Sequence, residues 1–519
     1  MRAYLLHRDR DFDWQASLPW QAEALTRDLE LTTLFDAMAQ GDKFVRDVAE
    51  KVVLAGFEKD LDTIRYRQDV LRECLAQPAI VRELYALAVE AVEAARKQYI
   101  GTILLRSPDW VLRGAIEHLE TFVGLIRKLR KFTNTYRDKF SSEGWTSFYS
   151  RLQEELSDEY VTGIEEHLTR LKFDGGMLLS AELGNGNKGN RYVLYRPPLL
   201  RNKPGLWERF LSWLKEILAE LVPFFKQKTP DYSFTLDPRD ESGARALAEL
   251  RSRGIAFTAN ALAQSADHVR AFFRALWTEL AFYVGCLNLQ GQLAGKGGPT
   301  CLTSSMAMDE GRLSFHGLYD ACLALKLGGT VVGNDANADG KELVMITGAN
   351  QGGKSTFLRS VGLAQLMLQC GMFVAAESFR SSVCDAVFTH FKREEDIAMK
   401  SGKLDEELSR MSDIVDHVTP YSLVLFNESF AATNEREGSE IARQIVSALV
   451  ERRIRVVFVT HLFELARGFH DGNKRNMLFL RAERESDGSR TFRLAGGEPL
   501  QTSFGEDLYT SIFGAWDGH

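Results

Sequence analysis

The sequence lacks any run of about 18 uncharged apolar residues, which is the length that a membrane-spanning helix requires. Its first residues, Met1-Arg2-Ala3-Tyr4, lead into charged residues without the apolar block of a secretory signal. The longest apolar helical candidate, residues 272–289, is interrupted by Arg274 and Glu279, which is typical of a buried or amphipathic helix. We therefore expect a cytoplasmic protein with no membrane partner.

Paired cysteines and an excess of positive charge are also lacking. The six cysteines are scattered, and none forms a Cys-x-x-Cys pair, so neither a zinc site nor a disulfide framework is indicated. The 64 basic residues are outnumbered by 71 acidic residues, which gives a formal net charge of -7. This balance argues against a protein that coats nucleic acid indiscriminately, so any DNA contact must use a local basic surface.

The 519 residues, 45% of them hydrophobic, are enough for two to four domains. Helical periodicity predicts a helical core or lever region over residues 1–150, with a helix starting at Ser107 and Pro108. Glycine and proline clusters between short alternating runs predict a small, clamp-like mixed α/β excursion over residues 151–240. Residues 241–298 read as a helical return to the core that ends in a glycine-rich joint at 291–298.

Residues 299–519 alternate between strand and helix patterns. Strands are predicted at 342–347, 422–426 and 455–460, and helices at 355–370 and 440–452. This order is what a parallel, nucleotide-binding sheet requires. The predicted fold class is therefore an α-helical N-terminal lever and core region followed by a C-terminal α/β P-loop ATPase domain of the ABC type.

The connection between the first of these strands and the following helix carries a phosphate-binding motif. Residues 348–355 match G-x-x-x-x-G-K-[ST]. Such a loop turns backbone N–H groups toward phosphates, and the lysine adds a point charge near the β and γ phosphates. A glycine-rich turn with a chance Lys-Ser is the alternative. The predicted ATP-binding residues are Gly348, Ala349, Asn350, Gln351, Gly352, Gly353, Lys354, Ser355 and Thr356.

A second element of the phosphate site is expected where the strand at 422–426 ends. Glu428 is placed to orient or deprotonate an attacking water. Asn427 stands where an aspartate would normally help to hold Mg²⁺, and its amide brings no negative charge. We predict Ser355 and Asn427 as the metal-binding residues; the alternative is that Asn427 and Glu428 merely cap the strand.

A third element is Thr460-His461, at the end of the next predicted strand. An imidazole at this position can reach the γ-phosphate and respond to its presence. A histidine at a strand end is more often structural when it is considered alone. The prediction that His461 takes part in catalysis therefore depends on the other two elements.

Several segments together resemble the MutS family of DNA mismatch-repair ATPases. The matching motifs are the P-loop within residues 347–356, the strand 422–428 and the segment 460–465. Residues 428–438 are similar to the loop that follows the family's catalytic glutamate. Residues 401–408 resemble the segment that family members present to the nucleotide of the opposite protomer. The resemblance covers residues 313–513, and residues 61–87 resemble the helical core that precedes them.

The resemblance implies ATP and Mg²⁺ as cofactors and Glu428 and His461 as catalytic residues. It implies a homodimer in which each ATPase domain completes the other's site, and mismatched or structured DNA as the partner. ATP binding and hydrolysis would then drive conformational change on DNA, in DNA repair or mismatch repair. No Phe-x-Glu triplet precedes residue 299, so we expect a short member that lacks the N-terminal mismatch-recognition domain.

Two alternative functions stay open. Asn427 favours an ATP-gated DNA-binding scaffold with little or no hydrolysis. The other alternative is an ABC-like ATPase that acts on a DNA structure other than a mismatch. The absence of a long heptad arm between the motifs and of a Leu-Ser-Gly-Gly-Gln signature argues against the chromosome-structure type of ABC ATPase.

Two basic stretches are candidates for DNA contact. The alternative for each is an ordinary solvated helix face. The first is interleaved with aromatic residues and contains Arg127, Lys128, Arg130, Lys131, Arg137 and Lys139; the second contains Arg191, Arg196, Arg201 and Lys203.

Overall fold

The computed structural model describes residues 1–102, 108–171, 178–183, 189–195, 241–349, 351–393, 402–472, 475–485 and 489–500. The chain divides into two compact units. The first unit comprises Met1, Leu87–Asn134 and Arg151–Arg274, and the second comprises Arg2–Ala86, Thr135–Ser150 and Ala275–His519. The long helices α5 (Pro78–Thr102), α6 (Pro108–Tyr136), α7 (Glu143–Glu155) and α10 (Glu241–Gly295) contribute residues to both units.

The first unit consists mainly of helices that pack against one another through buried apolar side chains. Besides its parts of α5, α6, α7 and α10, it contains α8 (Asp158–Leu171) and a two-stranded antiparallel hairpin of β1 (Leu178–Leu183) and β2 (Gly189–Tyr195). The rings of Phe122 on α6 and Phe273 on α10 stack with centroids 6.2 Å apart. Helix α6 begins at Pro108, as expected, while Ser107 lies outside the described residues.

The second unit begins with four helices: α1 (Ala22–Asp28), α2 (Leu31–Ala39), α3 (Lys43–Ala55) and α4 (Leu61–Ala76). The carboxylate of Asp42 caps α3 and that of Asp60 caps α4, because each accepts backbone N–H groups of the first turn. A short 3₁₀ helix, η1 (Arg137–Lys139), precedes α7.

The glycine-rich joint expected at 291–298 starts later than the sequence indicates, because α10 continues through Gly291 to Gly295. Side chains on its last turns are anchored on α2 and keep these residues helical. The Asn288 amide donates to the Met38 carbonyl at 2.8 Å, and the Gln292 amide donates to the Ala37 carbonyl at 2.8 Å. Tertiary hydrogen bonds thus override the low helix propensity of glycine.

A six-stranded sheet organises the C-terminal part of the second unit, in the order β12-β11-β6-β10-β9-β8. Its five strands from β8 to β11 in that order are parallel, and β12 pairs antiparallel with β11. A smaller sheet has the order β3-β7-β4-β5. The strands of the large sheet are β6 (Leu343–Thr347), β8 (Val387–Phe391), β9 (Leu423–Asn427), β10 (Arg455–Val459), β11 (Met477–Arg484) and β12 (Arg490–Gly496). Those of the small sheet are β3 (Ser304–Met306), β4 (Leu313–Leu318), β5 (Asn334–Asn337) and β7 (Ser378–Ser382).

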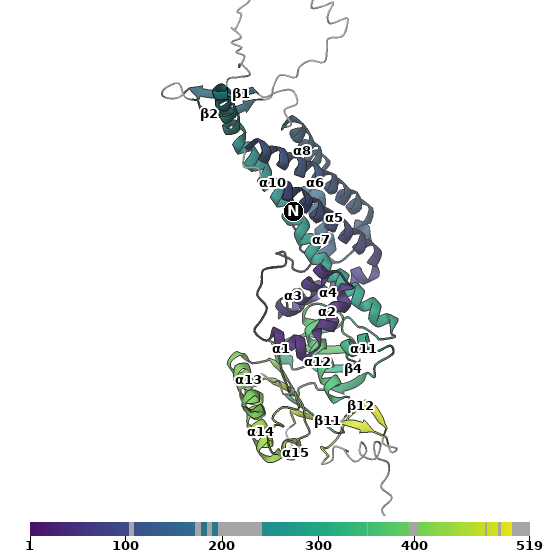
Figure 1. Cartoon of the computed structure of the whole chain (residues 1–519). Helices are drawn as coiled ribbons and strands as arrows, with labels where there is room; N and C mark the ends of the chain where they lie inside the picture. Colours follow the sequence, from purple (N-terminus) through teal and green to yellow (C-terminus); the bar gives the residue numbers. More distant parts are fainter. Residues whose placement is uncertain are drawn as a thin grey trace, which may run out of the picture. The chain divides into compact units, whose positions relative to one another are not determined.

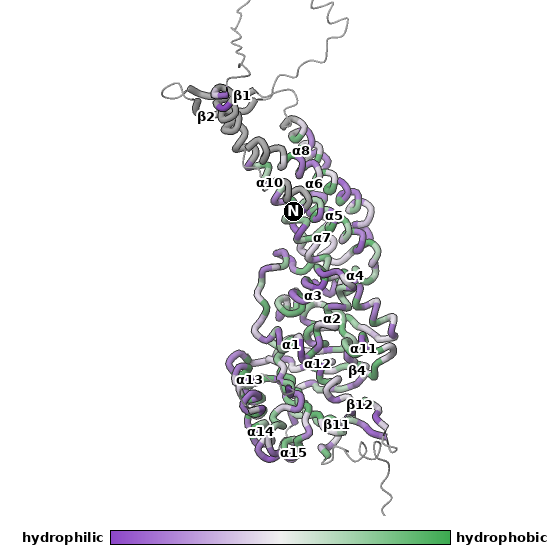
Figure 2. The backbone as a smooth tube through the Cα atoms, viewed as in Figure 1, coloured by the Kyte–Doolittle hydropathy of each residue, from purple (hydrophilic) through white to green (hydrophobic). Residues whose placement is uncertain are grey.

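Helices cover the large sheet on both faces. A buried apolar cluster joins α13 (Lys403–His417), α14 (Glu435–Glu451) and α15 (Phe463–Asp471) to β6, β9 and β10, and these helices lie together in Figure 1. Helix α12 (Lys354–Gln369) is buried along almost its whole length and also contacts β8, β9 and β10. Hydrophilic and hydrophobic segments alternate along α14, as an amphipathic helix requires (Figure 2). The remaining short helices are η3 (Met308–Glu310) and α11 (Ala321–Lys326).

The structure confirms the expected combination of a helical region and a mixed α/β region. The predicted strand at 342–347, the helix at 355–370 and the strand at 455–460 correspond to β6, α12 and β10 within two residues. The proposed domain boundaries stay predictions. In the described part of the chain, no helix combines the length and the apolar character needed to cross a membrane.

Candidate functional site

The loop between β6 and α12 has a backbone that only glycine can follow at several positions. Gly348 has φ +114° and Gly353 has φ +83°, both in the left-handed region. A Cβ atom at Gly348 would lie 2.9 Å from the backbone nitrogen of Ala482, and one at Gly352 would lie 2.7 Å from its Cβ. Gly348 and Gly352 therefore allow the loop to pack closely against β11, and Gly353 lies beside Phe492 of β12. Asn350 lies outside the described residues.

Lys354 is the first residue of α12, and its side chain is buried against this loop. Its Nζ donates to the carbonyl oxygens of Gly348 at 2.9 Å and Ala349 at 2.8 Å. Burial lowers the pKa of Lys354 to about 8, although the nearby Glu428 carboxylate opposes this effect. The loop thus holds an ammonium group that has no carboxylate within ion-pair distance in the described part of the chain.

Ser355 and Asn427 are brought together at the next position. The Ser355 hydroxyl donates to Oδ1 of Asn427 at 2.8 Å, which joins α12 to the end of β9. Both oxygens are hard ligands of the kind that Mg²⁺ accepts. No cluster of three or more His, Cys, Asp or Glu residues that could hold a metal occurs among the described residues. A cation at this position would therefore depend on these two neutral oxygens and on phosphate oxygens.

Glu428 and His461 form a half-buried pair at the ends of neighbouring strands. Oε1 of Glu428 lies 2.9 Å from Nε2 of His461. This hydrogen bond, followed by the charges of His461 and Lys354, lowers the pKa of Glu428 despite its burial. The Glu428 amide donates to the Val459 carbonyl at 2.9 Å, which fixes its backbone beside β10. The carboxylate is therefore ionised at neutral pH.

The turn that carries His461 is fixed by two oxygen acceptors. The Thr460 hydroxyl oxygen accepts the Leu462 amide at 2.9 Å. Oε1 of Glu435, in the first turn of α14, accepts the Phe463 amide at 2.8 Å and the Glu464 amide at 3.3 Å, so it caps α15. The imidazole position is thus set by α14 as well as by β10.

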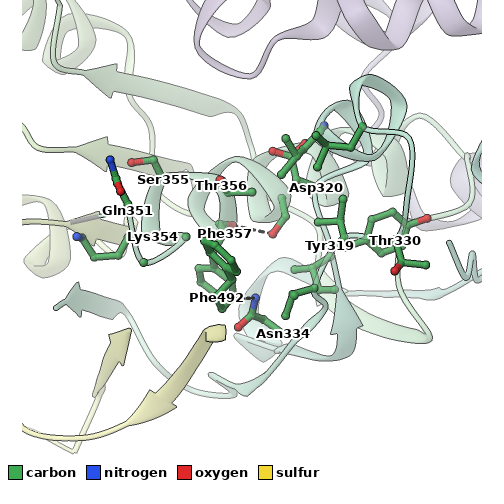
Figure 3. Close-up of a pocket in the computed structure, with 18 of the residues that line it drawn as sticks. Tyr319, Asp320, Thr330, Asn334, Gln351, Lys354, Ser355, Thr356, Phe357 and Phe492 are labelled. Carbon is green, nitrogen blue, oxygen red and sulfur yellow. Dashed lines mark hydrogen bonds between the residues drawn. The ribbon is translucent and has the colours of Figure 1, made fainter. Parts of the chain in front are cut away.

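A cavity of about 480 Å³ opens in front of the loop. Residues 351–356 and Glu428 line it, whereas Gly348, Ala349, Asn427 and His461 do not. Figure 3 shows Lys354, Ser355 and Gln351 at one end of the cavity and Tyr319 and Thr330 at the other. Several apolar side chains also line the cavity, and Phe492 among them lies beside Gly353 of the loop. The apolar lining comprises Leu318, Leu323, Leu327, Val331, Val332, Phe357 and Phe492.

The contribution of β5 and β12 to the cavity was not predicted from the sequence. Asn334 on β5 positions Phe492 on β12, because its Oδ1 accepts the Leu494 amide at 2.8 Å and its amide donates to the Phe492 carbonyl at 3.3 Å. Phe492 itself has φ +58°. No motif marks these residues, since they are separated by 158 positions in the chain and meet only in the folded structure.

The first basic stretch is largely paired with acidic residues of its own unit. Arg127 pairs with Glu165, Arg130 with Asp158, and the ammonium of Lys128 lies 2.6 Å from Glu90. These pairs reduce the positive charge that the stretch offers to phosphates. Of the second stretch, Arg196, Arg201 and Lys203 lie outside the described residues, and Arg191 lies on β2.

Comparisons with known proteins match both halves of the chain. Residues 59–296 match the family described as MutS2 N-terminal domain, and residues 344–507 match MutS domain V. The chain is 35% identical over 197 residues to DNA mismatch repair protein MSH3 of Coccidioides immitis (strain RS), which covers 37% of this chain and 18% of that protein. It is 39% identical over 125 residues to DNA mismatch repair protein MutS of Trichormus variabilis, covering 24% of this chain and 15% of that protein. Together these matches support the MutS family.

A third relative is also similar to the chain over only part of its length. DNA mismatch repair protein MutS of Clostridium kluyveri is 33% identical over 171 residues, which is 32% of this chain and 19% of that protein. The matched segments thus span less than a fifth of each of these MutS-type relatives. The MutS domain V match includes the P-loop motif, Glu428 and His461. The expected absence of a mismatch-recognition domain stays a prediction.

Proposed function

We propose that this protein binds ATP with Mg²⁺ and hydrolyses it. The observation that carries the proposal is the common cavity, where the P-loop motif and the Glu428 carboxylate lie together. The loop amides and Lys354 would hold the phosphates, and the apolar residues that line the cavity would contact the base. Glu428, kept ionised by His461, is suited to orient or deprotonate a water that attacks the γ-phosphate.

The proposal includes an ABC-type P-loop ATPase fold for the α/β region, and the geometry around Lys354 suits phosphate. The Lys354 ammonium now bonds to two loop carbonyls, and phosphate oxygens would offer it charged acceptors in their place. Mg²⁺ would be held by Ser355 and, through a bound water, by Asn427. Gly348, Ala349, Asn350, Gln351, Gly352, Gly353 and Thr356 would complete the phosphate site.

The MutS-type relatives are named for DNA mismatch repair, and this supports DNA as the partner. We propose a cytoplasmic homodimer in which ATP binding and hydrolysis change the conformation of the protein on mismatched or structured DNA. Because the first basic stretch is paired with acids, DNA contact through it requires that phosphates displace carboxylates. The slope of DNA affinity against salt should then report the number of phosphates that the basic side chains neutralise.

Equilibrium titration with a fluorescent ATP analogue tests the nucleotide site. The wild-type protein should bind the analogue, and Lys354→Ala should lose binding while its circular dichroism spectrum and melting temperature are retained. Equal affinity in both proteins would refute the assignment of the loop.

Binding to homoduplex, mismatched and branched DNA, with and without ATP and across a salt series, tests the DNA function. The proposal requires that ATP changes the affinity for at least one of these substrates. Sedimentation velocity at several protein concentrations, with and without ATP, tests the dimer. A hydrolysis rate per protomer that does not change with concentration would argue against a site shared between protomers.

An ATP-gated scaffold with little or no hydrolysis is the second candidate, and Asn427 favours it. Its amide hydrogen-bonds Ser355 but supplies no charge to a cation. Release of γ-phosphate by wild type and by Glu428→Gln separates the two candidates, because a scaffold has no turnover to lose. Measurable wild-type turnover that Glu428→Gln abolishes would exclude the scaffold.

A further inference from the structure

The loop that follows β9 contains two residues in a conformation that side chains disfavour. Glu428 has φ +54° and Phe430 has φ +63°, so the strand end turns through two left-handed, non-glycine positions. Such a backbone persists only where the surroundings hold it, and it sets the direction of the Glu428 side chain. The structure shows which groups hold it.

Glu407, on the second turn of α13, holds the far side of this turn. Its carboxylate Oε2 accepts the backbone amide of Phe430 at 2.8 Å, and both residues are buried. Glu407 does not line the nucleotide cavity, so its contact with this site runs through the backbone of the loop. The ring of Phe430 stacks on that of His390, with centroids 5.2 Å apart.

Ser429 and His390 tie the middle of the turn to β8. The Ser429 hydroxyl lies 2.6 Å from the His390 carbonyl and 2.7 Å from its Nδ1, and Nε2 of His390 lies 2.9 Å from the Glu407 carbonyl. Burial lowers the pKa of His390 to about 4, so the ring is neutral and carries one N–H. Donation from Nε2 to the Glu407 carbonyl leaves Nδ1 without a hydrogen, so the single Ser429 hydroxyl hydrogen faces two acceptors, the His390 carbonyl and Nδ1. Helix α13, strand β8 and the loop therefore form one hydrogen-bonded network.

We propose that Glu407 is a positioning residue for the Glu428 carboxylate. By holding the Phe430 amide, it keeps Glu428 in the left-handed turn from which Oε1 reaches His461 and the carboxylate faces the cavity. The position of α13 then controls the geometry of hydrolysis without changing the phosphate loop. The expected effect of Glu407 on the hydrolysis rate rests on the proposed ATPase function. The effect of Glu407 on the backbone of the loop can be measured without nucleotide.

Glu407→Ala is the informative variant, and its neighbour supplies a matched control. Glu406 lies on the same turn of α13, but it pairs with Arg393 and Arg410 rather than with the loop. Glu407→Gln is the conservative variant, because its side-chain carbonyl oxygen can still accept the Phe430 amide. Ser429→Ala removes the hydroxyl that joins the loop to β8.

The first measurement is amide hydrogen exchange of Phe430, resolved to single residues, in the protein without nucleotide. We expect exchange to be at least about 10-fold faster in Glu407→Ala than in wild type, and near the wild-type rate in Glu407→Gln and Glu406→Ala. Unchanged protection in Glu407→Ala would overturn the proposal, whether or not the protein hydrolyses ATP.

The second measurement is steady-state release of γ-phosphate at saturating Mg²⁺-ATP. Glu407→Ala should lower kcat about 10- to 100-fold with KM changed less than about 3-fold, because the carboxylate is misplaced while the phosphate loop is intact. Ser429→Ala should lower kcat in the same direction, and Glu407→Gln should restore most of it. A wild-type protein without turnover would refute the ATPase function alone, since the exchange result stands by itself. A wild-type kcat in Glu407→Ala would refute the positioning role.

Discussion

Nε2 of His461 lies 2.9 Å from Oε1 of Glu428, and this contact joins the ends of the adjacent parallel strands β10 and β9. Val459 pairs with Asn427 at this point; Glu428 is the residue after Asn427, and His461 is the second residue after Val459. A one-residue shift of register would separate them. The sheet therefore places the pair, and the hydrogen bond from the imidazole in turn lowers the pKa of the carboxylate.

Glu428→Gln should separate ATP binding from ATP hydrolysis. The amide keeps the size of the side chain but cannot accept a proton from water, so the hydrolysis rate should fall about 10²- to 10⁴-fold. Affinity for ATP should change little, because the phosphate loop is untouched. Nucleotide titration and γ-phosphate release on the same preparation check this. Loss of binding would show instead that Glu428 holds the nucleotide.

His461→Ala should shift the pH dependence of hydrolysis. Its hydrogen bond is the largest cause that lowers the pKa of Glu428, so its removal should raise that pKa toward or above the ordinary value of a glutamate. The acidic limb of the kcat profile should then move to higher pH. Profiles of wild type and variant between pH 4 and 8 give the shift, and superimposable limbs would contradict it.

The burial of Lys354 predicts that ATP affinity falls as the pH is raised through about 8. Below that pH the Lys354 side chain is a charged ammonium group that attracts phosphate. Above that pH, in the protein without nucleotide, it is a neutral amine. Bound phosphate raises the pKa of Lys354, so above about pH 8 the protein takes up a proton when it binds ATP. The affinity for ATP therefore falls as the pH rises. Titrations at pH 7 and pH 9.5 should differ by about 10-fold or more. Equal affinities would show that the ammonium is not used.

Asn427→Asp should strengthen binding of Mg²⁺ with ATP. A carboxylate at this position would place a negative charge beside Ser355, whose hydroxyl now donates to the neutral Asn427 oxygen at 2.8 Å. We expect the Mg²⁺ concentration for half-maximal ATP binding to fall about 10-fold. Mg²⁺ titrations at fixed ATP, with wild type as the control, decide this. An unchanged midpoint would place the metal away from residue 427.

Local sequence signals were enough to predict the loop and the elements around it. The P-loop spacing predicts a strand before Gly348 and a helix from Ser355, and β6 and α12 lie there within one residue. The sequence predicts Glu428 and Lys354 at one phosphate site, and the fold brings both residues to one cavity. The reason is topological: parallel strands with helical connections bring their carboxyl ends to one edge.

Features that depend on contacts between distant residues could not be predicted from the sequence. Phe492 reaches the cavity through the β11–β12 pairing and the side chain of Asn334, and neither belongs to a motif. The basic residues at 127–130 suggested a cationic surface, but their acidic partners lie on other helices and became visible only in the fold. The sequence also does not indicate that Glu407 and His390 are buried, because both residue types are usually exposed or partly exposed.

The N-terminal segment of the second unit depends on one buried acid. Glu279 on α10 accepts the amides of Leu5 at 2.6 Å, Leu6 at 3.3 Å and Phe12 at 2.9 Å. Glu279→Ala would leave these donors without their acceptor, so the free energy of unfolding should fall by about 3 kcal/mol. Urea denaturation measures the loss. A change below about 0.5 kcal/mol would show that other groups hold this segment.

Glu279→Gln should show how the buried charge affects stability with pH. Burial raises the pKa of Glu279 to about 7, above its value in the unfolded chain. Between the two pKa values Glu279 is protonated in the folded chain and ionised in the unfolded chain. The stability that this group contributes is therefore fully present below the pKa of the unfolded chain. It is lost as the pH rises through about 7, the pKa of the folded chain. The free energy of unfolding of wild type relative to Glu279→Gln should therefore be lower at pH 8 than at pH 5, by about 2–3 kcal/mol. Urea denaturation of both proteins at the two pH values measures this difference, in which the titration of all other groups cancels. A difference that does not change with pH would show that the three amide donors keep Glu279 ionised throughout.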